Sequence, residues 1–233
     1  MLIAHRGAAG YGPENTLAAY RQAVSLGFVY AETDVRLTAD NQWVCIHDER
    51  VDRTSDGSGT VATMTLEQLT ALDFGTWFHP DFAGEPICLL ADLLVLCQRT
   101  GLRLLVEIKD TTLSDLQLMT LLDLVHQYQV EKQVSFISFH WEHLGRIRHL
   151  HPHFWLGYLA WEMTDATLEG LLSSMERFFI DVQRFPDGEP LQLAKKAGIP
   201  VVAWTVNERE QLKVLREQGV HITTDSLLPV DFT

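Results

Sequence analysis

Short apolar runs alternate with amphipathic segments along most of this chain, and this alternation limits the folds that it can adopt. The runs are rich in β-branched and aromatic residues, as buried strands are. They read LIAH, VYAETDV, WVCIH, RLLVEIK, VSFIS, FWLGYL, RFFIDV, IPVVAWTV and VHITTD. Strands that alternate with helices form a parallel sheet. With roughly eight such strands in 233 residues, we predict that the sheet closes into a TIM barrel, (β/α)₈, rather than an open doubly wound sheet.

The segments between these runs have the periodicity of helices, and several end on a glycine, which is common at helix C-termini. They cover residues 15–27, 90–101, 112–129, 142–151, 167–177, 190–198 and 207–219. No glycine-rich dinucleotide-binding fingerprint follows the first apolar run, which argues further against an open nucleotide-binding sheet.

One long segment, residues 48–87, interrupts the alternation. It is polar and rich in turn residues, and it is longer than an ordinary barrel loop. We therefore expect residues 1–233 to form a single domain, with an inserted subdomain or lid over about 48–87 and one short helix near Thr65–Leu72. Such insertions commonly carry substrate contacts.

Charge and hydropathy exclude several classes of partner. The net charge of −13 repels duplex nucleic acid and anionic membrane surfaces, although a metal ion or an arginine could still hold a small anionic substrate locally. The longest apolar stretch contains Asp92 and is much shorter than the ~20 residues of a membrane helix, and no signal peptide is visible. We predict a soluble, cytoplasmic protein that binds a small molecule and has no nucleic-acid or stable membrane partner. Self-association into a homo-oligomer is compatible with this sequence.

The chain has three cysteines, Cys45, Cys88 and Cys97, and all lie in apolar surroundings without metal-ligand spacing. This placement favours reduced thiols in the core over a redox or metal site.

Polar residues stand where several of the apolar runs end. In a parallel barrel, the active site lies at the C-terminal ends of the strands, so these positions are candidates for chemistry. The residues at the ends of runs are His5, Arg6, His47, Asp48, Glu107, Lys109 and Asp225, and Glu32, Asp34 and Trp204 lie within the runs YAETDV and VVAWTV.

Glu32 and Asp34 are separated by one residue, and this spacing points both carboxylates to the same face of a strand. Glu107 brings a third carboxylate to the same end of the barrel. Three carboxylates make a hard, oxygen-rich site that suits one divalent metal ion, Mg²⁺ or Ca²⁺, with Mn²⁺ as an alternative. The competing interpretation is that the carboxylates face solvent or pair with cations such as Arg6, Arg36 and Lys109.

His5 and His47 lie close to these carboxylates in the expected barrel and could act as general acid and base. The competing interpretation is that each is a hydrogen-bonded core histidine. Arg6 offers a planar donor pair that matches a phosphate group, and Lys109 adds a second cation. Together with a metal ion, these cations would neutralise a phosphodiester and its transition state.

Other candidates are weaker. The stretch HWEHLGRIRHLHPH contains five histidines but has no zinc-protease spacing, so we interpret it as a solvated helix face. Trp204 could form an apolar wall for the substrate or pack in the barrel core. Asp225 could orient a neighbour or simply end the last strand, and SDGSG fits a surface turn better than a phosphate loop.

Taken together, these motifs resemble the glycerophosphodiester phosphodiesterases, which are metal-dependent TIM-barrel enzymes. AHRG, PENT, AETDVRLTAD, VCIHDERVDRTSDGSGTV, DFGTWFHPDFAGEPI, VEIK and AWTVN occur in the family's order over essentially the whole chain. The chain departs from the family at Ile87 and Cys88, where Pro-Thr is common, and in the ITTDSL stretch near its end. The resemblance is closest to the cytoplasmic bacterial members.

The resemblance implies that Glu32, Asp34 and Glu107 bind the divalent metal and that His5 and His47 are the catalytic acid and base. It further implies that Arg6 and Lys109 hold the phosphate and that Trp204 lines the glycerol side. The expected reaction is hydrolysis of glycerophosphodiesters, such as glycerophosphocholine or glycerophosphoethanolamine, to glycerol 3-phosphate and an alcohol. Two alternatives remain at this point: a phosphodiester lyase that releases a cyclic phosphate, and a noncatalytic barrel that binds phosphorylated metabolites.

Overall fold

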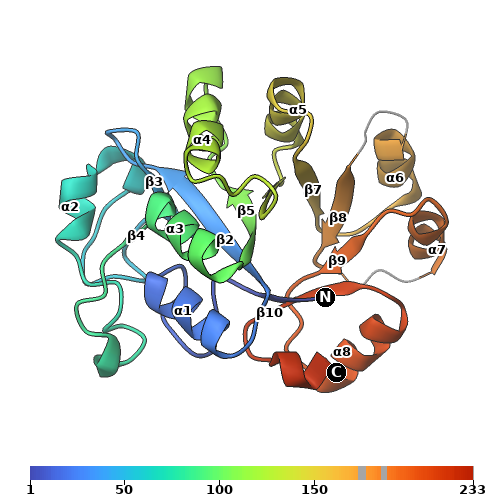
Figure 1. The fold of residues 1–233 in the computed structure, drawn as a ribbon, viewed down its shortest axis with the longest axis horizontal. Helices are drawn as coiled ribbons and strands as arrows, with labels where there is room; N and C mark the ends of the chain where they lie inside the picture. The colour runs from blue at the N-terminus through green and yellow to red at the C-terminus, as the bar shows by residue number, and fades with distance from the viewer. Residues whose placement is uncertain (173–176, 185–187, 233) are drawn as a thin grey trace.

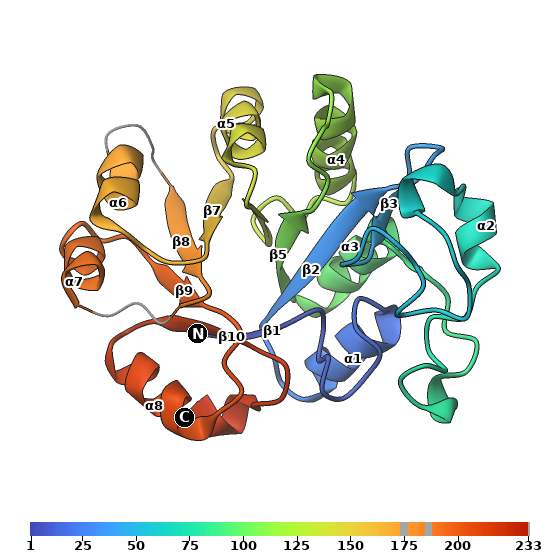
Figure 2. The ribbon, with the colours of Figure 1, turned by 180° about the vertical axis from the view of Figure 1, so that it is seen from behind.

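The computed structural model describes residues 1–172, 177–184 and 188–232. Eight parallel strands pair in a closed ring, in which β10 returns to pair with β1 and β1 pairs with β2. The strands are β1 (Leu2–Ala4), β2 (Tyr30–Leu37), β5 (Arg103–Ile108), β6 (Val134–Ser138), β7 (Trp155–Ala160), β8 (Phe178–Val182), β9 (Val201–Ala203) and β10 (His221–Thr224). The predicted TIM barrel is confirmed (Figures 1 and 2).

Helices surround the barrel and connect its strands (Figure 1). They are α1 (Leu17–Ser25), α3 (Leu90–Thr100), α4 (Asp115–Gln127), α5 (Trp141–Leu150), α6 (Asp165–Leu172), α7 (Gly188–Lys196) and α8 (Arg209–Glu217). Each begins and ends within a few residues of a predicted helical segment, except that part of the segment 167–177 lies outside the described residues. Local signals explain the agreement: α4 begins with a capping box between Ser114 and Gln117, and α3 ends at Gly101 with φ +78°.

Side chains of alternate residues fill the two sides of the barrel wall. Outward-facing residues pack against the helices in one large apolar core. Inward-facing residues form a smaller cluster, the inner apolar layer, to which six strands contribute one side chain each. These residues are Ile3, Leu105, Ile137, Leu159, Phe179 and Val202. Because side chains alternate with a period of two, the residue two positions beyond each of them faces the C-terminal end of the barrel.

The run WVCIH is not a barrel strand, and its assignment to the parallel sheet is wrong. It forms β3 (Trp43–Cys45), which pairs antiparallel with β2 in the register Val35↔Cys45. Only residues 38–42 join the two strands, which suits a hairpin, whereas a parallel crossover needs about a dozen residues. The composition of a buried strand is the same in both orientations, so composition could not reveal its direction.

The segment between β3 and β4 (Cys88–Leu89) contains three short helices: η1 (Val61–Thr63), α2 (Leu66–Thr70) and η2 (Pro80–Phe82). β4 pairs antiparallel with β3, so the segment starts and ends at the same side of the barrel. The segment lies at the edge of the molecule in both views (Figures 1 and 2). It has an apolar cluster separate from the barrel core: Val44, Ile46, Val51, Val61, Leu69, Phe74 and Ile87.

The three cysteines are buried and unpaired, as predicted. In the part of the chain that the structure describes, no helix has both the length and the hydrophobicity of a membrane span.

Candidate active site

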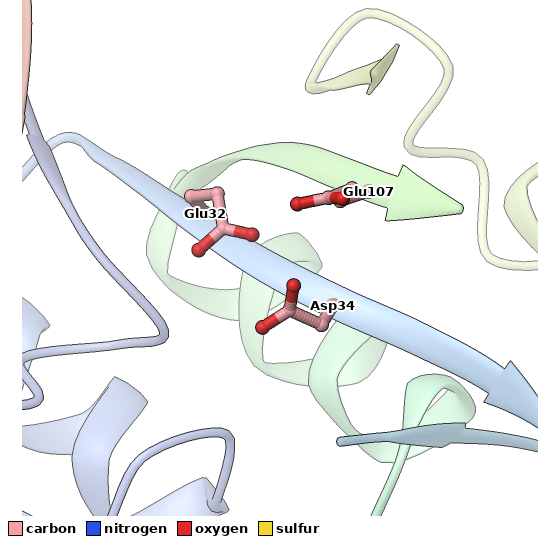
Figure 3. Close-up of side chains that lie close together, drawn as sticks. All are labelled: Glu32, Asp34 and Glu107. Atoms are coloured by element: carbon pink, nitrogen blue, oxygen red, sulfur yellow. The ribbon is translucent and has the colours of Figure 1, made fainter. Parts of the chain in front are cut away.

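Three carboxylates meet inside the barrel, near its C-terminal end. Glu32 and Asp34 project from β2, and Glu107 projects from β5, where it lies in register with Asp34 (Figure 3). One carboxylate oxygen from each residue lies within 4.8 Å of the others. The site is well shielded, since Asp34 is 1% exposed and Glu32 is 4% exposed.

Two cations flank the carboxylates. Lys109 Nζ donates to Glu107 Oε1 at 2.8 Å and lies 3.6 Å from Asp34 Oδ1. Arg6 Nε lies 3.3 Å from Asp34 Oδ2. The carboxylates therefore form the predicted cluster and also pair with two of the cations that the competing interpretation named. The third cation considered, Arg36, instead donates to Asp110 and to the carbonyl oxygen of His47.

Burial and neighbouring charges give the three carboxylates different pKa values. Burial opposes ionisation of Asp34, but the charges of Arg6 and Lys109 hold its pKa well below the usual value. Burial, together with the charges of Asp34 and Glu107, raises the pKa of Glu32 well above normal. Burial and the charge of Asp34 raise the pKa of Glu107 to about 7. The protein alone therefore stabilises one of the three anions well and the other two poorly.

This imbalance fits a divalent cation. The donors are all carboxylate oxygens, which Mg²⁺ and Ca²⁺ prefer. Within the described residues, Glu32 Oε1 is buried without a hydrogen-bond partner, and an orphaned buried acceptor is costly unless a ligand or water satisfies it. A cation bound among the three oxygens would compensate both Glu32 and Glu107.

His5 directly follows β1 and is held by a carboxylate. Its Nδ1 lies 2.7 Å from Asp225 Oδ1, and its Nε2 lies 3.9 Å from Glu32 Oε2. Asp225 follows β10, and its Oδ2 accepts a hydrogen bond from Asn207 Nδ2 at 2.9 Å. A carboxylate at Nδ1 keeps the proton on that nitrogen and leaves Nε2 free to exchange a proton toward the carboxylate cluster. Of the two roles that the sequence left open for Asp225, orienting a neighbour is the one that this contact matches.

His47 reaches the same site by another route. It follows β3, and the hairpin returns the chain beside β2, where Ile46 N donates to Asp34 O at 2.9 Å. The sequence placed His47 at the end of a parallel barrel strand, and that placement is wrong. Its Nδ1 lies 2.7 Å from Asp48 Oδ1. Burial, together with the charges of Arg6 and Lys109, lowers the pKa of His47 despite the opposing charge of Asp34.

An aromatic wall stands at the C-terminal end of the barrel. Trp204, just after β9, lies with its ring centroid 5.9 Å from that of Phe139 and 6.0 Å from that of Trp161. On β8, Asp181 is buried, and within the described residues its Oδ1 has no hydrogen-bond partner. Trp204 was a sequence candidate, whereas Asp181 was missed because FFIDV reads as an ordinary buried strand.

A profile of the glycerophosphoryl diester phosphodiesterase family matches residues 5–227, nearly the whole chain. The chain belongs to this family. The resemblance noted in the sequence is thus confirmed, and the protein is a glycerophosphodiester phosphodiesterase by class.

Three relatives of this phosphodiesterase align with it over more than nine-tenths of their length. A glycerophosphodiester phosphodiesterase from Caldanaerobacter subterraneus subsp. tengcongensis is 34% identical over 234 residues, which cover 97% of this chain and 93% of the relative. An Oleispira antarctica phosphodiesterase, solved in complex with the product sn-glycerol-3-phosphate, is 29% identical with a TM-score of 0.89, over 97% of this chain and 92% of that one. A glycerophosphodiester phosphodiesterase from Agrobacterium tumefaciens is 25% identical with a TM-score of 0.81, over 99% and 97%.

The PENT stretch of this phosphodiesterase contributes a residue whose role the sequence did not reveal. Asn15, with φ +57°, places its side chain beneath Asp34. Its Nδ2 donates to Asp34 Oδ2 at 2.8 Å, and its Oδ1 accepts from Asp34 N at 3.2 Å and from Tyr20 OH at 2.9 Å. Asn is among the few residues other than glycine that tolerate this backbone conformation, so the motif sets both the turn and the contact.

Gly7 allows the same loop to lie against α1. It has φ +82°, and a Cβ atom there would lie 2.8 Å from the Cβ of Ala19. A larger residue would push the AHRG turn away from the helix, and the backbone conformation itself favours glycine.

A chain of ion pairs joins Arg6 to Asp48, whose Oδ1 contacts His47 Nδ1. Arg6 Nη1 donates to Glu14 Oε1 at 2.9 Å, and Arg53 Nη1 donates to Glu14 Oε2 at 2.8 Å. Arg53 Nε also donates to Asp48 Oδ2 at 2.7 Å. Sequence reasoning assigned no role to Glu14 or Arg53, although both stand in the quoted motifs.

The remaining candidates lie outside the site. His143, in the histidine-rich stretch, is 4% exposed and its Nε2 contacts Asp110 O at 3.0 Å, so the prediction of a solvated helix face is wrong for this residue. In SDGSG, Gly57 N donates to Ser55 Oγ and Gly59 N donates to Asp52 Oδ2. Both amides are hydrogen-bonded within the turn, which agrees with the interpretation of SDGSG as a surface turn.

Proposed function

We propose that this phosphodiesterase hydrolyses glycerophosphodiesters, such as glycerophosphocholine and glycerophosphoethanolamine, to glycerol 3-phosphate and an alcohol. We further propose that it uses one divalent metal ion, Mg²⁺ or Ca²⁺, with Mn²⁺ as an alternative. The observation that carries the proposal is the buried cluster of three carboxylates with His5 and His47 beside it. The product bound in the Oleispira antarctica enzyme supports glycerol phosphate as the recognised half of the substrate.

In this proposal, Glu32, Asp34 and Glu107 hold the metal. When bound, the ion would neutralise phosphate charge and acidify an oxygen that it coordinates. Arg6 and Lys109 already lie beside the cluster and would bind the remaining phosphate oxygens, since a phosphodiester gains negative charge in its transition state. Trp204 would cover the carbon atoms of the glycerol.

His5 and His47 would transfer the protons. Each has its Nδ1 on an aspartate, so each directs Nε2 as the exchanging nitrogen. One histidine removes a proton from the attacking hydroxyl group, of water or of the glycerol C2 carbon, as its oxygen bonds to phosphorus. The other donates a proton to the leaving alcohol oxygen as the bond between that oxygen and phosphorus breaks. If the glycerol hydroxyl attacks, water then opens the cyclic phosphate, so both routes release glycerol 3-phosphate. Asp225 and Asp48 would fix the orientation of the two imidazole rings and keep the Nδ1 proton in place.

Release of glycerol 3-phosphate, measured with a coupled dehydrogenase over a panel of head groups, tests this function. We expect activity with Mg²⁺ or Ca²⁺, its loss in excess chelator, and a fall of about 10³-fold in Glu32→Gln and His5→Ala. Glu67→Gln, an exposed change on α2, is the matched control and should retain full activity.

Full activity in either site variant, or in chelator, would overturn the site assignment. Accumulation of a cyclic phosphate, followed by ³¹P NMR, would identify a lyase instead. Binding of glycerophosphocholine without release of glycerol 3-phosphate would identify a noncatalytic binder.

We also propose that the enzyme works in the cytoplasm and that residues 48–87 serve as an inserted subdomain that completes the site. The buried, unpaired cysteines support a reducing compartment. The contact of Arg53 with Glu14 supports the second proposal, because Glu14 lies outside the segment and accepts from Arg6 beside the carboxylate cluster.

A further inference from the structure

A cavity of about 800 Å³ opens at the N-terminal end of the barrel, opposite the carboxylate cluster. Its rim is formed where strands begin: Tyr30 starts β2, Arg103 starts β5 and Trp155 starts β7. Its floor includes Leu105, Phe179 and Val202, which belong to the inner apolar layer. A cavity of this size is in the range that holds small organic ligands, about 300–1,000 Å³.

This cavity is separate from the candidate active site. Along β5, Arg103 lines the cavity, Leu105 belongs to the inner apolar layer and Glu107 belongs to the carboxylate cluster. Because inward-facing residues recur every second position, a single layer of apolar side chains separates the two sites along this strand. A ligand in the cavity would therefore contact none of the proposed catalytic residues.

The charge of the cavity is opposite to that of the whole chain. Arg103, Lys132 and Arg177 line it, although the chain carries a net charge of −13. The one carboxylate in the lining, Glu131, is already held by His126 Nδ1 at 2.8 Å. Across residues 1–172, 177–184 and 188–232, none of the three cations forms an ion pair with a carboxylate.

The hydrogen bonds of the two arginines leave their charge uncompensated. Arg103 Nη1 donates to Tyr30 OH at 3.0 Å, and Arg177 Nη1 donates to His153 O at 3.4 Å. Both partners are neutral acceptors. Guanidinium groups at a cavity mouth without a counter-charge attract anions, and their donor geometry suits phosphate, sulfonate and carboxylate groups.

The walls of the cavity are partly apolar, so a ligand that fits it needs an apolar part as well as a negative charge. Trp155 is 43% exposed at its edge, and Tyr30, Phe154 and Phe179 also line it. An inorganic anion would satisfy the cations but leave the exposed part of Trp155 in contact with water, since Phe154 and Phe179 are already buried. We propose that this N-terminal mouth is a second binding site, for a small organic anion that carries a phosphate, sulfonate or carboxylate group on an apolar body.

Fluorescent probes test separately whether the ligand needs a negative charge and whether it needs an apolar body. The anion 8-anilinonaphthalene-1-sulfonate should bind the wild-type enzyme at one equivalent, and its uncharged analogue N-phenyl-1-naphthylamine should bind about tenfold more weakly. Saturating glycerol 3-phosphate with Mg²⁺ should leave the sulfonate bound, since the two sites are separate. Displacement by dodecyl phosphate or by 1-naphthyl phosphate would distinguish an aliphatic from an aromatic body.

A double variant, Arg103→Gln with Arg177→Gln, removes the two guanidinium groups. We expect its dissociation constant for the sulfonate probe to rise about tenfold, with no change for the uncharged probe. Arg21→Gln with Arg99→Gln is the matched control, because these exposed arginines lie outside the cavity and carry the same charge. Circular dichroism melts and phosphodiesterase activity should be unchanged in both double variants.

Four results would overturn the proposal: no binding of the sulfonate probe to the wild type, its displacement by glycerol 3-phosphate, equal weakening in both double variants, or displacement by neither phosphate ester.

Discussion

Asp225 contacts His5 through a 2.7 Å interaction between Oδ1 and Nδ1, and this contact fixes the orientation of the imidazole ring. In Asp225→Asn, the amide oxygen can still accept the Nδ1 proton, but the negative charge is lost. We expect kcat to fall about 10- to 100-fold with little change in KM, because the residue acts on proton transfer rather than on binding. Steady-state kinetics over a range of pH would measure this.

Asp115→Asn provides the control for that change, since Asp115 is a surface carboxylate paired with Arg146. It should leave kcat unchanged. An Asp225→Asn enzyme with the kcat of the wild type would contradict the positioning role.

Asn15 stabilises Asp34, so its loss should affect stability as well as activity. Asn15→Ala removes the donor to Asp34 Oδ2 and the acceptor for Asp34 N and Tyr20 OH, and it puts alanine at φ +57°. Buried polar groups left unsatisfied cost about 1–3 kcal/mol each, so we expect the free energy of unfolding to fall by about 2–4 kcal/mol. Urea denaturation would measure it.

Asn15→Gly separates the effect of the lost hydrogen bonds on stability from the effect of the backbone conformation. Glycine tolerates the positive φ, which would recover about 1 kcal/mol of the loss, but it restores no hydrogen bond. If Asn15→Gly were as stable as the wild type, the backbone conformation and not the contact with Asp34 would explain the asparagine.

At the scale of elements, the hairpin of β2 and β3 and the segment that follows it bring side chains to the candidate site. The hairpin returns His47 to the side of Asp34, and Arg53 of the following segment bridges Asp48 and Glu14. The segment also contacts α1, where Glu85 Oε1 accepts from Ala18 N at 2.9 Å. These contacts connect the segment to α1 and to the end of the barrel that holds the carboxylate cluster.

Replacement of Arg53 tests this connection. Arg53→Gln removes the bridge between Glu14 and Asp48, so Arg6 and His47 lose a shared restraint. We expect kcat/KM to fall about tenfold, while the affinity for Mg²⁺ measured by calorimetry stays the same, because no proposed metal ligand is changed. Arg50→Gln is the control within the same segment, since Arg50 pairs with Asp52 away from the site. Equal activity of the two variants would contradict the bridging role.

At the scale of the whole molecule, the buried carboxylates link stability to pH. Burial and nearby charge raise the pKa of Glu107 to about 7, and burial raises the pKa values of Glu32 and Asp181 well above normal. The folded protein therefore holds these protons more tightly than the unfolded chain, and stability falls as pH rises above the unfolded values, about 4. In chelator, we expect the melting temperature to fall between pH 5 and pH 8.

A bound metal reverses this dependence, because it requires the deprotonated carboxylates. The gain in melting temperature from Mg²⁺ should therefore increase from pH 5 to pH 8. Glu107→Gln should reduce both effects. A melting temperature in chelator that does not change over this range would contradict the assigned pKa values.

Below about pH 4, stability should fall again. Hydrogen bonds with Arg53 and His47 lower the pKa of Asp48 to about 2, and that stabilisation is lost as the group is protonated.

The sequence by itself determined the barrel, the seven helical segments and the candidate site residues. Hydrophobic periodicity and turn residues are local properties, so the strands that carry Glu32, Asp34 and Glu107, and the strand ends that His5 and Lys109 follow, could be read directly from them.

Only the tertiary structure decided which side chains meet. The direction of β3, the contact of Asp225 with His5 and the position of Asn15 under Asp34 all depend on segments far apart in the chain or on turn geometry. Likewise, Arg103 and Arg177 are ordinary surface cations in the sequence, and closure of the barrel brings them to one cavity. Local patterns specify elements, whereas ring closure and hairpin pairing bring distant side chains into contact.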